Sequence, residues 1–242
     1  MQYLLRKKII YLLFVILLTS HPGFSQFRQL NLPDHGQKRL HFGINLGANR
    51  SNYNFTRHPR FLQYDSVLAI ESINSTGINL AWLVNLRLSD HFAIRTYPLN
   101  LIFTEKAFQY SLKYPDKPSK EDSITTKKVQ GITLAFPVQL KFSSDRIHNL
   151  RVYMIAGGKV EYDMAASAGK KNAEDIIKLN KLDYGIEAGM GFHFYFPVFV
   201  LTPEIKVGWG LNNVHARDKD LKFSNTIDKI NSRSITFSLT VE

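Results

Sequence analysis

The chain has 242 residues, of which 44% are hydrophobic and 21% charged, so it is too apolar for a disordered protein and too polar for a bundle of transmembrane helices. It contains no cysteine, which excludes Cys-ligated metal centres, thiol nucleophiles, disulfide bonds and a lipid-modified N-terminal cysteine. The 31 Lys and Arg residues outnumber the 20 Asp and Glu residues and give a formal net charge of +11. Such an excess supports nucleic-acid binding only if the basic residues gather in one place.

The first 25 residues have the order of regions found in a secretory signal peptide. Basic residues at 6–8 precede an apolar run at 9–18, and small or polar residues follow up to Ser25. A membrane anchor is the alternative, but the apolar run is too short, because a helix needs about 20 apolar residues to cross a bilayer. We therefore predict that 1–25 is a signal peptide and that the rest of the chain is exported.

Alternating apolar and polar residues predict strands almost everywhere in the exported chain. Throughout 182–196, for example, the even-numbered residues are apolar, while most odd-numbered residues are charged, polar or glycine. Long loops predicted at 50–76, 113–127, 165–181 and 213–231 alternate with short turns, which is typical of outer-membrane barrels. The eight predicted strands lie at about 40–49, 77–88, 91–112, 128–142, 150–164, 182–196, 198–212 and 232–241.

The two faces of these strands decide between a soluble and a membrane barrel. A soluble barrel exposes its polar face, whereas a membrane barrel needs an apolar outer face with aromatic residues near both rims. Aromatic residues lie near the predicted strand ends, and the glycines fall mostly on the polar faces, where a narrow lumen leaves little room. We therefore predict an all-β fold: an eight-stranded antiparallel up-and-down transmembrane β-barrel of the outer-membrane type at 40–242, after a short periplasmic extension at 26–39.

The predicted strand at 91–112 changes the phase of its alternation near Pro98. After this residue, Leu99, Leu101 and Phe103 take the apolar face. A β-bulge at Pro98 would produce such a slip. A contact required for function is the alternative reason for the irregularity.

Charged residues on the polar faces point into the predicted lumen, where bases and acids nearly balance. We expect a structural network of ion pairs, because an unpaired charge in a narrow barrel would be costly. An ion path or a pair of catalytic carboxylates is the alternative, but eight strands enclose no wide aqueous pore. The predicted network consists of Arg95, Lys159, Glu161, Glu187, Glu204 and Lys206.

The sequence offers no recognisable catalytic or metal-binding motif. Its eight histidines are scattered and lack the HExxH spacing of zinc hydrolases. The enzymatic alternative is a lipid-modifying enzyme that uses His193, or His215 with Ser167 or Ser224, but no G-x-S-x-G elbow supports it. We therefore expect no enzyme activity, no catalytic residues, no metal site and no cofactor.

The surplus of basic residues lies mainly in the predicted loops, where acidic residues are interleaved with it. Loops of an outer-membrane barrel would meet the phosphates of outer-membrane lipids, which attract Lys and Arg. We therefore expect these lipids as partners and no nucleic acid. The predicted location is the outer membrane of a Gram-negative bacterium.

Several segments together resemble the PorT family. The segment that carries most of the likeness contains Phe92, Arg95, Pro98 and Glu105. The resemblance implies a non-enzymatic integral outer-membrane barrel needed for type IX secretion, the system that exports cargo with a C-terminal signal and is also linked to gliding motility. It further implies other subunits of the type IX translocon as partners. The resembling segments are 38–49, 64–67, 77–80, 92–99, 104–106, 137–142 and 157–158.

A generic small outer-membrane barrel is the alternative function. It would act as an adhesin or as a protein that stabilises the envelope, since the same strands would serve either role. Loss of cargo export in a deletion strain would distinguish a secretion component from either of these.

Overall fold

The structure is a computed structural model, and it describes residues 29–59, 67–113, 124–164, 179–216 and 226–242. The predicted signal peptide lies outside the described residues. No helix in the described part of the chain is long and apolar enough to cross a membrane. The elements within these ranges are the 3-10 helix η1 (Pro33–Gln37) and the strands β1 (Leu40–Arg57), β2 (Val67–Ile73), β3 (Ser75–Arg87), β4 (Phe92–Leu112), β5 (Ile124–Ser143), β6 (Leu150–Asp163), β7 (Leu182–Tyr195), β8 (Val200–Gly210) and β9 (Ile227–Val241).

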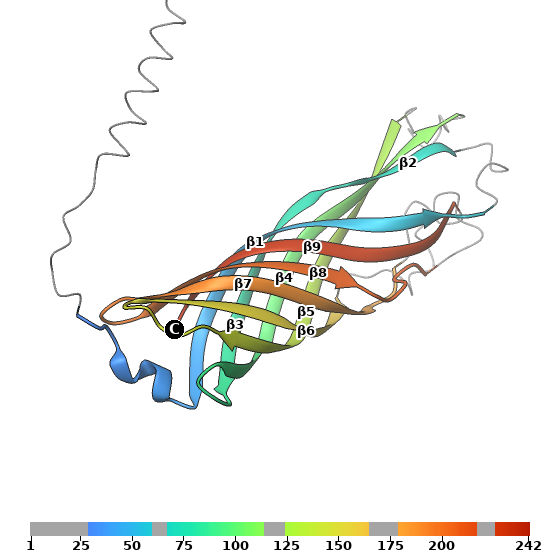
Figure 1. Ribbon diagram of the computed structural model, residues 1–242. Coiled ribbons are helices and arrows are strands. Elements are labelled where there is room, and N and C mark those ends of the chain that lie inside the picture. The colour runs from blue at the N-terminus through green and yellow to red at the C-terminus, as the bar shows by residue number, and fades with distance from the viewer. Residues whose placement is uncertain (1–28, 60–66, 114–123, 165–178, 217–225) are drawn as a thin grey trace, which may run out of the picture.

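The strands form one closed antiparallel barrel (Figure 1). They pair in the order β2-β4-β3-β1-β9-β8-β7-β6-β5, and β5 pairs back with β4. β3 pairs with the first part of β4 and β2 with its last part, so β2 and β3 together occupy one position in the barrel wall. The wall therefore has eight strand positions, which confirms the predicted eight-stranded up-and-down barrel.

Several strands extend further than predicted at one end of the barrel. β1 continues to Arg57, β5 begins at Ile124 and β9 begins at Ile227, so parts of the predicted loops are strand. The prediction of a loop throughout 50–76 was wrong for a second reason, because this segment also contains β2. The alternation does not stop at these points; instead, the apolar face passes from the outside of the wall to the inside.

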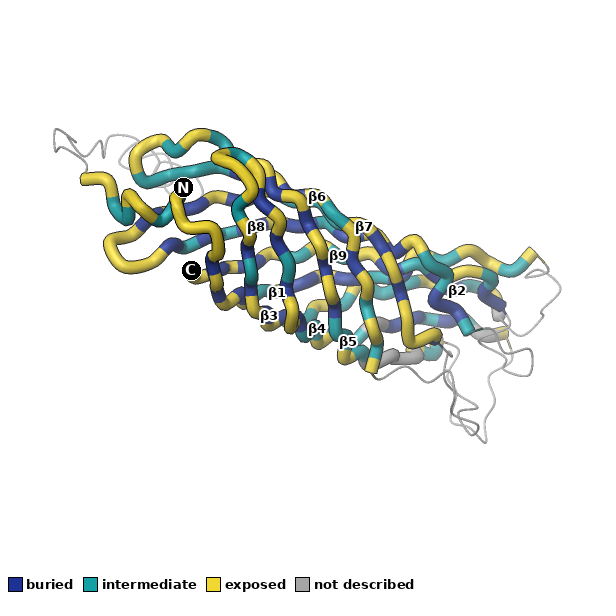
Figure 2. Tube along the Cα trace, turned by 90° about the horizontal axis from the view of Figure 1, so that it is seen from below, coloured by how far each residue is buried: buried dark blue, intermediate teal, exposed yellow. Residues whose placement is uncertain are grey.

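This exchange of faces is clearest in β4. Figure 2 shows where buried and exposed residues alternate along the strands, and the residue types show which of the two faces is apolar. The outward residues are mostly apolar from Phe92 to Phe103 and polar from Glu105 onward. The inward residues are mostly polar along the first part of the strand and become apolar at Phe108 and Tyr110, both fully buried. An apolar outer face identifies the first part of β4 as the part that lies in lipid.

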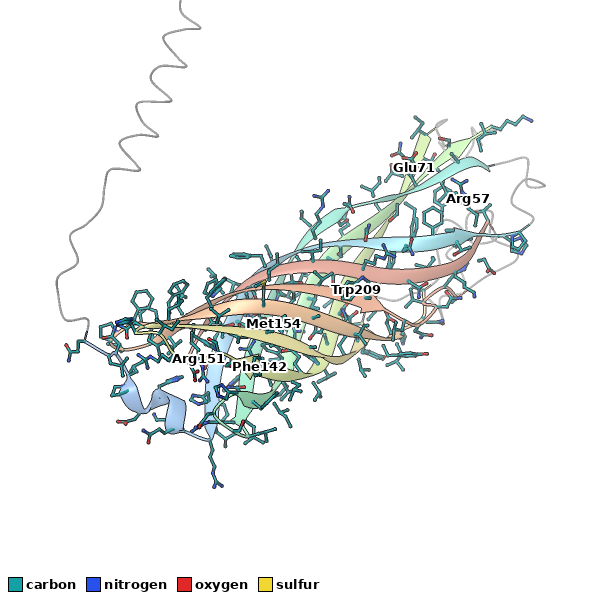
Figure 3. The ribbon with its side chains drawn as sticks, in the orientation of Figure 1. Arg57, Glu71, Phe142, Arg151, Met154 and Trp209 are labelled. Atoms are coloured by element: carbon teal, nitrogen blue, oxygen red, sulfur yellow. The ribbon has the colours of Figure 1, made fainter. Side chains whose placement is uncertain are left out.

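The apolar outer face has the height of a bilayer core. Since a strand rises about 3.3 Å per residue, the stretch from Phe92 to Phe103, tilted by about 45°, spans about 25 Å. On the outside of β1 and β9, the apolar residues end at nearly the same level of the wall. Arg50 is the first polar outward residue of β1, and it pairs with Ile235, the last apolar outward residue before Arg233 on β9. Large apolar side chains such as Phe142 and Met154 project outward within this band (Figure 3).

Beyond the apolar band, the inside of the barrel is closed by an apolar cluster. Tyr53 stacks on Phe108 with 5.4 Å between ring centroids. Burying these side chains in the lumen stabilises a part of the barrel that has no lipid around it. The cluster comprises Tyr53, Ile70, Phe108, Tyr110, Leu179, Val214, Ile227 and Ile230.

The register confirms the predicted bulge at Pro98. Trp82 of β3 pairs with Leu99, but Val84 pairs with Thr96, so β4 contains one residue more than its partner strand between these pairs. The pairing of β4 with β5 is also one residue out of step between Thr96 and Leu101. Pro98 and Leu99 are both exposed, which restores the apolar outer face after the slip.

The described part of the extension, 29–39, lies against the short-turn end of the barrel. The backbone N–H of Asn31 donates to Oδ1 of Asn149 at 2.9 Å, and its side-chain amide donates to the carbonyl of Tyr195 at 2.9 Å. Arg146 donates to the carbonyl of Leu32 at 3.1 Å, and its guanidinium lies 3.7 Å from the ring centroid of Tyr195. Two segments distant in sequence, the turn with Arg146 and Asn149 and the end of β7 at Tyr195, therefore hold the extension against the barrel.

Candidate functional site

The centre of the lumen contains a fully buried ion pair that joins opposite sides of the barrel. Arg95 of β4 pairs with Glu204 of β8, and neither side chain is exposed to solvent. The Tyr153 hydroxyl donates to the same carboxylate. Lys206 Nζ lies 3.2 Å from Glu204 Oε1. One carboxylate thus interacts with two cations and a phenol, which connects β4, β6 and β8 through the lumen.

The other residues predicted for the lumen network lie in separate groups. Lys159 Nζ is 2.5 Å from Glu161 Oε1, and both residues line a small cavity in the lumen. Glu187 accepts a hydrogen bond from the side-chain amide of Gln139. The structure therefore brings Arg95, Glu204 and Lys206 together, pairs Lys159 with Glu161, and places Glu187 against a neutral partner.

The segment that resembles the PorT family divides between the two sides of the wall. Phe92 and Pro98 are exposed on the outer face, whereas Arg95 is buried in the lumen. Glu105 lies just beyond the apolar band on the same strand. Only Phe92, Pro98 and Glu105 are therefore placed where another protein could reach them.

Sequence reasoning missed a second polar cluster near the short-turn end. Lys141 Nζ lies 2.7 Å from His193 Nε2, and the other ring nitrogen of His193 lies 2.8 Å from Thr202 Oγ1. The His193 ring stacks on Tyr153 with 4.6 Å between centroids, and Lys141 Nζ lies 4.7 Å from the same ring. The alternation places all four residues on inward positions, but only the register of β5 to β8 shows that they meet.

The residues of the enzymatic alternative do not assemble among the described residues. His193 contacts Lys141 and Thr202, as described above. His215 is buried at the loop end, where its Nδ1 lies 3.4 Å from the carbonyl oxygen of Asp228. Ser167 and Ser224 lie outside the described residues.

A small cavity opens at the short-turn mouth, between the docked extension and the strands. One ligand atom from each of His35, His41 and Glu242 lies within 4.8 Å of the others, a spacing that could hold a metal ion. His41 Nε2 must donate to the carbonyl of Lys38 at 3.0 Å, since a carbonyl only accepts, so Nδ1 keeps its lone pair. Lys141 lines the same cavity and its charge opposes a bound cation.

Burial, followed by the proximity of His41, lowers the pKa of His35 from 6.5 to about 4. The docked extension therefore binds fewer protons than the free one, so docking is fully stabilised above pH 6.5 and weakens as the pH falls toward 4. We expect hydrogen exchange in 29–39, corrected for its intrinsic pH dependence, to be faster at pH 5 than at pH 7.5. In the variant His35→Gln, hydrogen exchange in 29–39 should depend less on pH. The same pH dependence as in the wild type would contradict the role of His35.

The lumen is filled along its length by these side chains. Three cavities lined by inward residues have volumes of about 40, 40 and 30 Å³, each enough for a few water molecules at most. From the short turns to the loops, the filling changes from the Lys141 cluster through the central ion pairs to the apolar cluster. Such a barrel can anchor a protein in a membrane and present its two ends, but it offers no wide aqueous path.

Comparison with solved structures finds other small outer-membrane barrels. Neisserial surface protein A from Neisseria has 10% identity and a TM-score of 0.42, with 84% of this chain and 99% of that chain covered. OprG from Pseudomonas aeruginosa has 7% identity and a TM-score of 0.42, covering 85% and 95%. Ail from Yersinia pestis has 10% identity and a TM-score of 0.38, covering 83% and 96%. No curated protein matches the sequence.

The family comparison covers most of the chain. Residues 24–216 match the family described as outer membrane protein beta-barrel domain. The match agrees with the closed barrel and with its apolar outer band. This chain therefore belongs to the outer membrane protein beta-barrel domain family and is an outer-membrane β-barrel.

Proposed function

We propose that this barrel is a non-enzymatic accessory of type IX secretion and acts through its exposed ends. The observation that carries the proposal is the filled lumen, in which Arg95, Tyr153 and Glu204 meet at the centre. A barrel filled in this way does not itself conduct a folded cargo, so a role in export requires contacts with other subunits. The resemblance of the segment around Arg95 and Pro98 to the PorT family supports the choice of this secretion system.

The short-turn end is the surface that we assign to these contacts. Short turns of outer-membrane barrels face the periplasm, where cargo and other subunits of the translocon would be encountered. The docked extension enlarges this end, and Arg146 fixes it to the turns. Outer-membrane lipids would surround the apolar band and complete the set of partners.

A deletion strain tests the proposal. We expect cargo with a C-terminal signal to accumulate in the periplasm when the gene is deleted, and export to return when the wild-type chain is supplied. Complementation with Arg146→Ala should restore export less well than Arg39→Ala, because Arg39 is exposed and Arg146 holds the extension. The heat-modifiable band of this barrel and the levels of other barrels must be normal in the complemented strains.

Unimpaired export in the deletion strain would contradict the secretion role. The second candidate, an adhesin or envelope-stabilising barrel, is favoured by one observation. β1, β2, β4, β5 and β9 continue beyond the apolar band around the buried apolar cluster, which builds a platform on the loop side (Figure 1). Loss of cell attachment or of envelope integrity with normal export would then establish this function.

A further inference from the structure

A hollow lies on the outer surface of the barrel, at the edge of the apolar band near the loop end. Its volume is about 410 Å³. It opens on the outside of the wall, where Trp209, Arg233 and Ile235 are exposed. The hollow is lined by Arg50, Asn52, Asn74, Val207, Gly208, Trp209, Arg233, Ser234 and Ile235.

The strand register arranges the outward lining residues in two rows. In the upper row, Asn52 of β1 pairs with Arg233 of β9, which pairs with Trp209 of β8. In the lower row, Arg50 pairs with Ile235, which pairs with Val207. Three neighbouring strands therefore present a polar and aromatic row directly above a largely apolar one.

The charge of the hollow is positive and unbalanced. Arg50 and Arg233 are diagonal neighbours across β1 and β9, about 7–8 Å apart, so both guanidinium groups can reach one phosphate. No carboxylate is among the lining residues. Within the described part of the chain, neither arginine side chain forms a hydrogen bond or an ion pair, in contrast to the arginine side chains of the turns and the lumen.

The depth of the hollow matches the level of lipid headgroups. Arg50 and Arg233 stand where the outward residues of β1 and β9 change from apolar to polar. Trp209 lies beside them, and tryptophan favours the boundary between hydrocarbon and headgroups. Val207 and Ile235 lie one row deeper, within reach of an acyl chain. Long loops of outer-membrane barrels face the outside, so this boundary belongs to the outer leaflet.

We propose that the hollow binds a phosphorylated glycolipid of the outer leaflet, with Arg50 and Arg233 holding its phosphate and Val207 and Ile235 contacting its acyl chain. Arginine suits this role because its planar donor fork binds phosphate through two hydrogen bonds and keeps its charge at any physiological pH. The site would fix one lipid beside the seam between β1 and β9, where the first and last strands of the barrel close.

Trp209 provides the signal for a test, because the chain contains only two tryptophans. The other, Trp82, is exposed on the apolar band, so Trp82→Phe retains an apolar face and leaves Trp209 as the sole fluorophore. This parent variant, in detergent micelles, is titrated with lipid A that carries two phosphates and with dephosphorylated lipid A. We expect the phosphorylated form to change the Trp209 emission and to bind at least about 10-fold more tightly.

A double variant tests the two arginines. Arg50→Gln with Arg233→Gln should weaken binding of phosphorylated lipid A at least about 10-fold. The matched control, Lys38→Gln with Arg39→Gln, removes the same charge at the opposite end and should bind like the parent. Equal binding of the two lipids by the parent would overturn the proposal without any arginine variant, and an equal effect of both double variants would assign the binding to net charge alone and also overturn it.

Discussion

Replacing Glu204 with glutamine should lower the free energy of unfolding by about 3–5 kcal/mol, the largest effect that we expect from any single lumen substitution. Glu204→Gln keeps the shape of the side chain but leaves the guanidinium of Arg95 without its counterion in a fully buried position. It also removes the carboxylate that Lys206 and Tyr153 share. Urea unfolding in detergent, followed by the heat-modifiable band on gels, measures the change.

The matched control is Glu71→Gln, the same substitution at an exposed position of β2. It should change the free energy of unfolding by less than about 0.5 kcal/mol. Removing both charges with Arg95→Met and Glu204→Leu should recover part of the loss, because the fully buried guanidinium is then absent and only Lys206 still lacks its carboxylate partner. If Glu204→Gln were as stable as the wild type, the central ion pair would have no structural role.

Replacing Gly157 with alanine should destabilise the barrel by about 3 kcal/mol, through a clash with the neighbouring backbone. A Cβ at this position would lie 2.1 Å from the carbonyl oxygen of Val138, and a backbone atom cannot move aside as a flexible side chain would. Gly157 also pairs with Gln139 on one side and with Glu187 on the other, and these two residues hydrogen bond to each other. A side chain would stand between them.

Gly158 supplies the control for this prediction, because it is the next residue and faces outward. A Cβ there would have only the carbonyl oxygen of Gly185 nearby, at 3.9 Å. Gly158→Ala should therefore change the free energy of unfolding by less than about 0.5 kcal/mol, and alanine costs less chain entropy in a strand than glycine. Similar losses for the two variants would show that the lumen clash is not the cause.

The proposed role in secretion depends on the two ends of the barrel, and these ends differ in chemistry. The short-turn end contains His35, Lys141 and His193 around a small cavity, and we expect docking of its extension to depend on pH. The loop end is sealed by the apolar cluster around Phe108. The proposed periplasmic contact and the outer surface platform therefore involve different residues, and the export and attachment assays report on them separately.

The sequence by itself determined the barrel and the location of its apolar face. Alternation with period two fixes which side chains share a side of a strand, because successive residues point in opposite directions. It therefore sufficed to place Arg95 and Glu204 inside, Phe142 and Trp209 outside, and a bulge at Pro98. Where the faces exchange sides, at Arg50 for example, the same rule led to a loop in place of a strand.

Only the tertiary structure decided which inward residues meet. Strand register and barrel closure bring Arg95 to Glu204, 109 positions away, and place Lys141 beside His193 and Arg50 beside Arg233. Local alternation carries no information about register between strands, since register depends on the packing of the whole wall. The hollow beside Trp209 follows from the same closure, because it combines β1 with β8 and β9. The docked extension likewise depends on the tertiary structure, because it contacts Arg146, Asn149 and Tyr195, which lie far from it in the sequence.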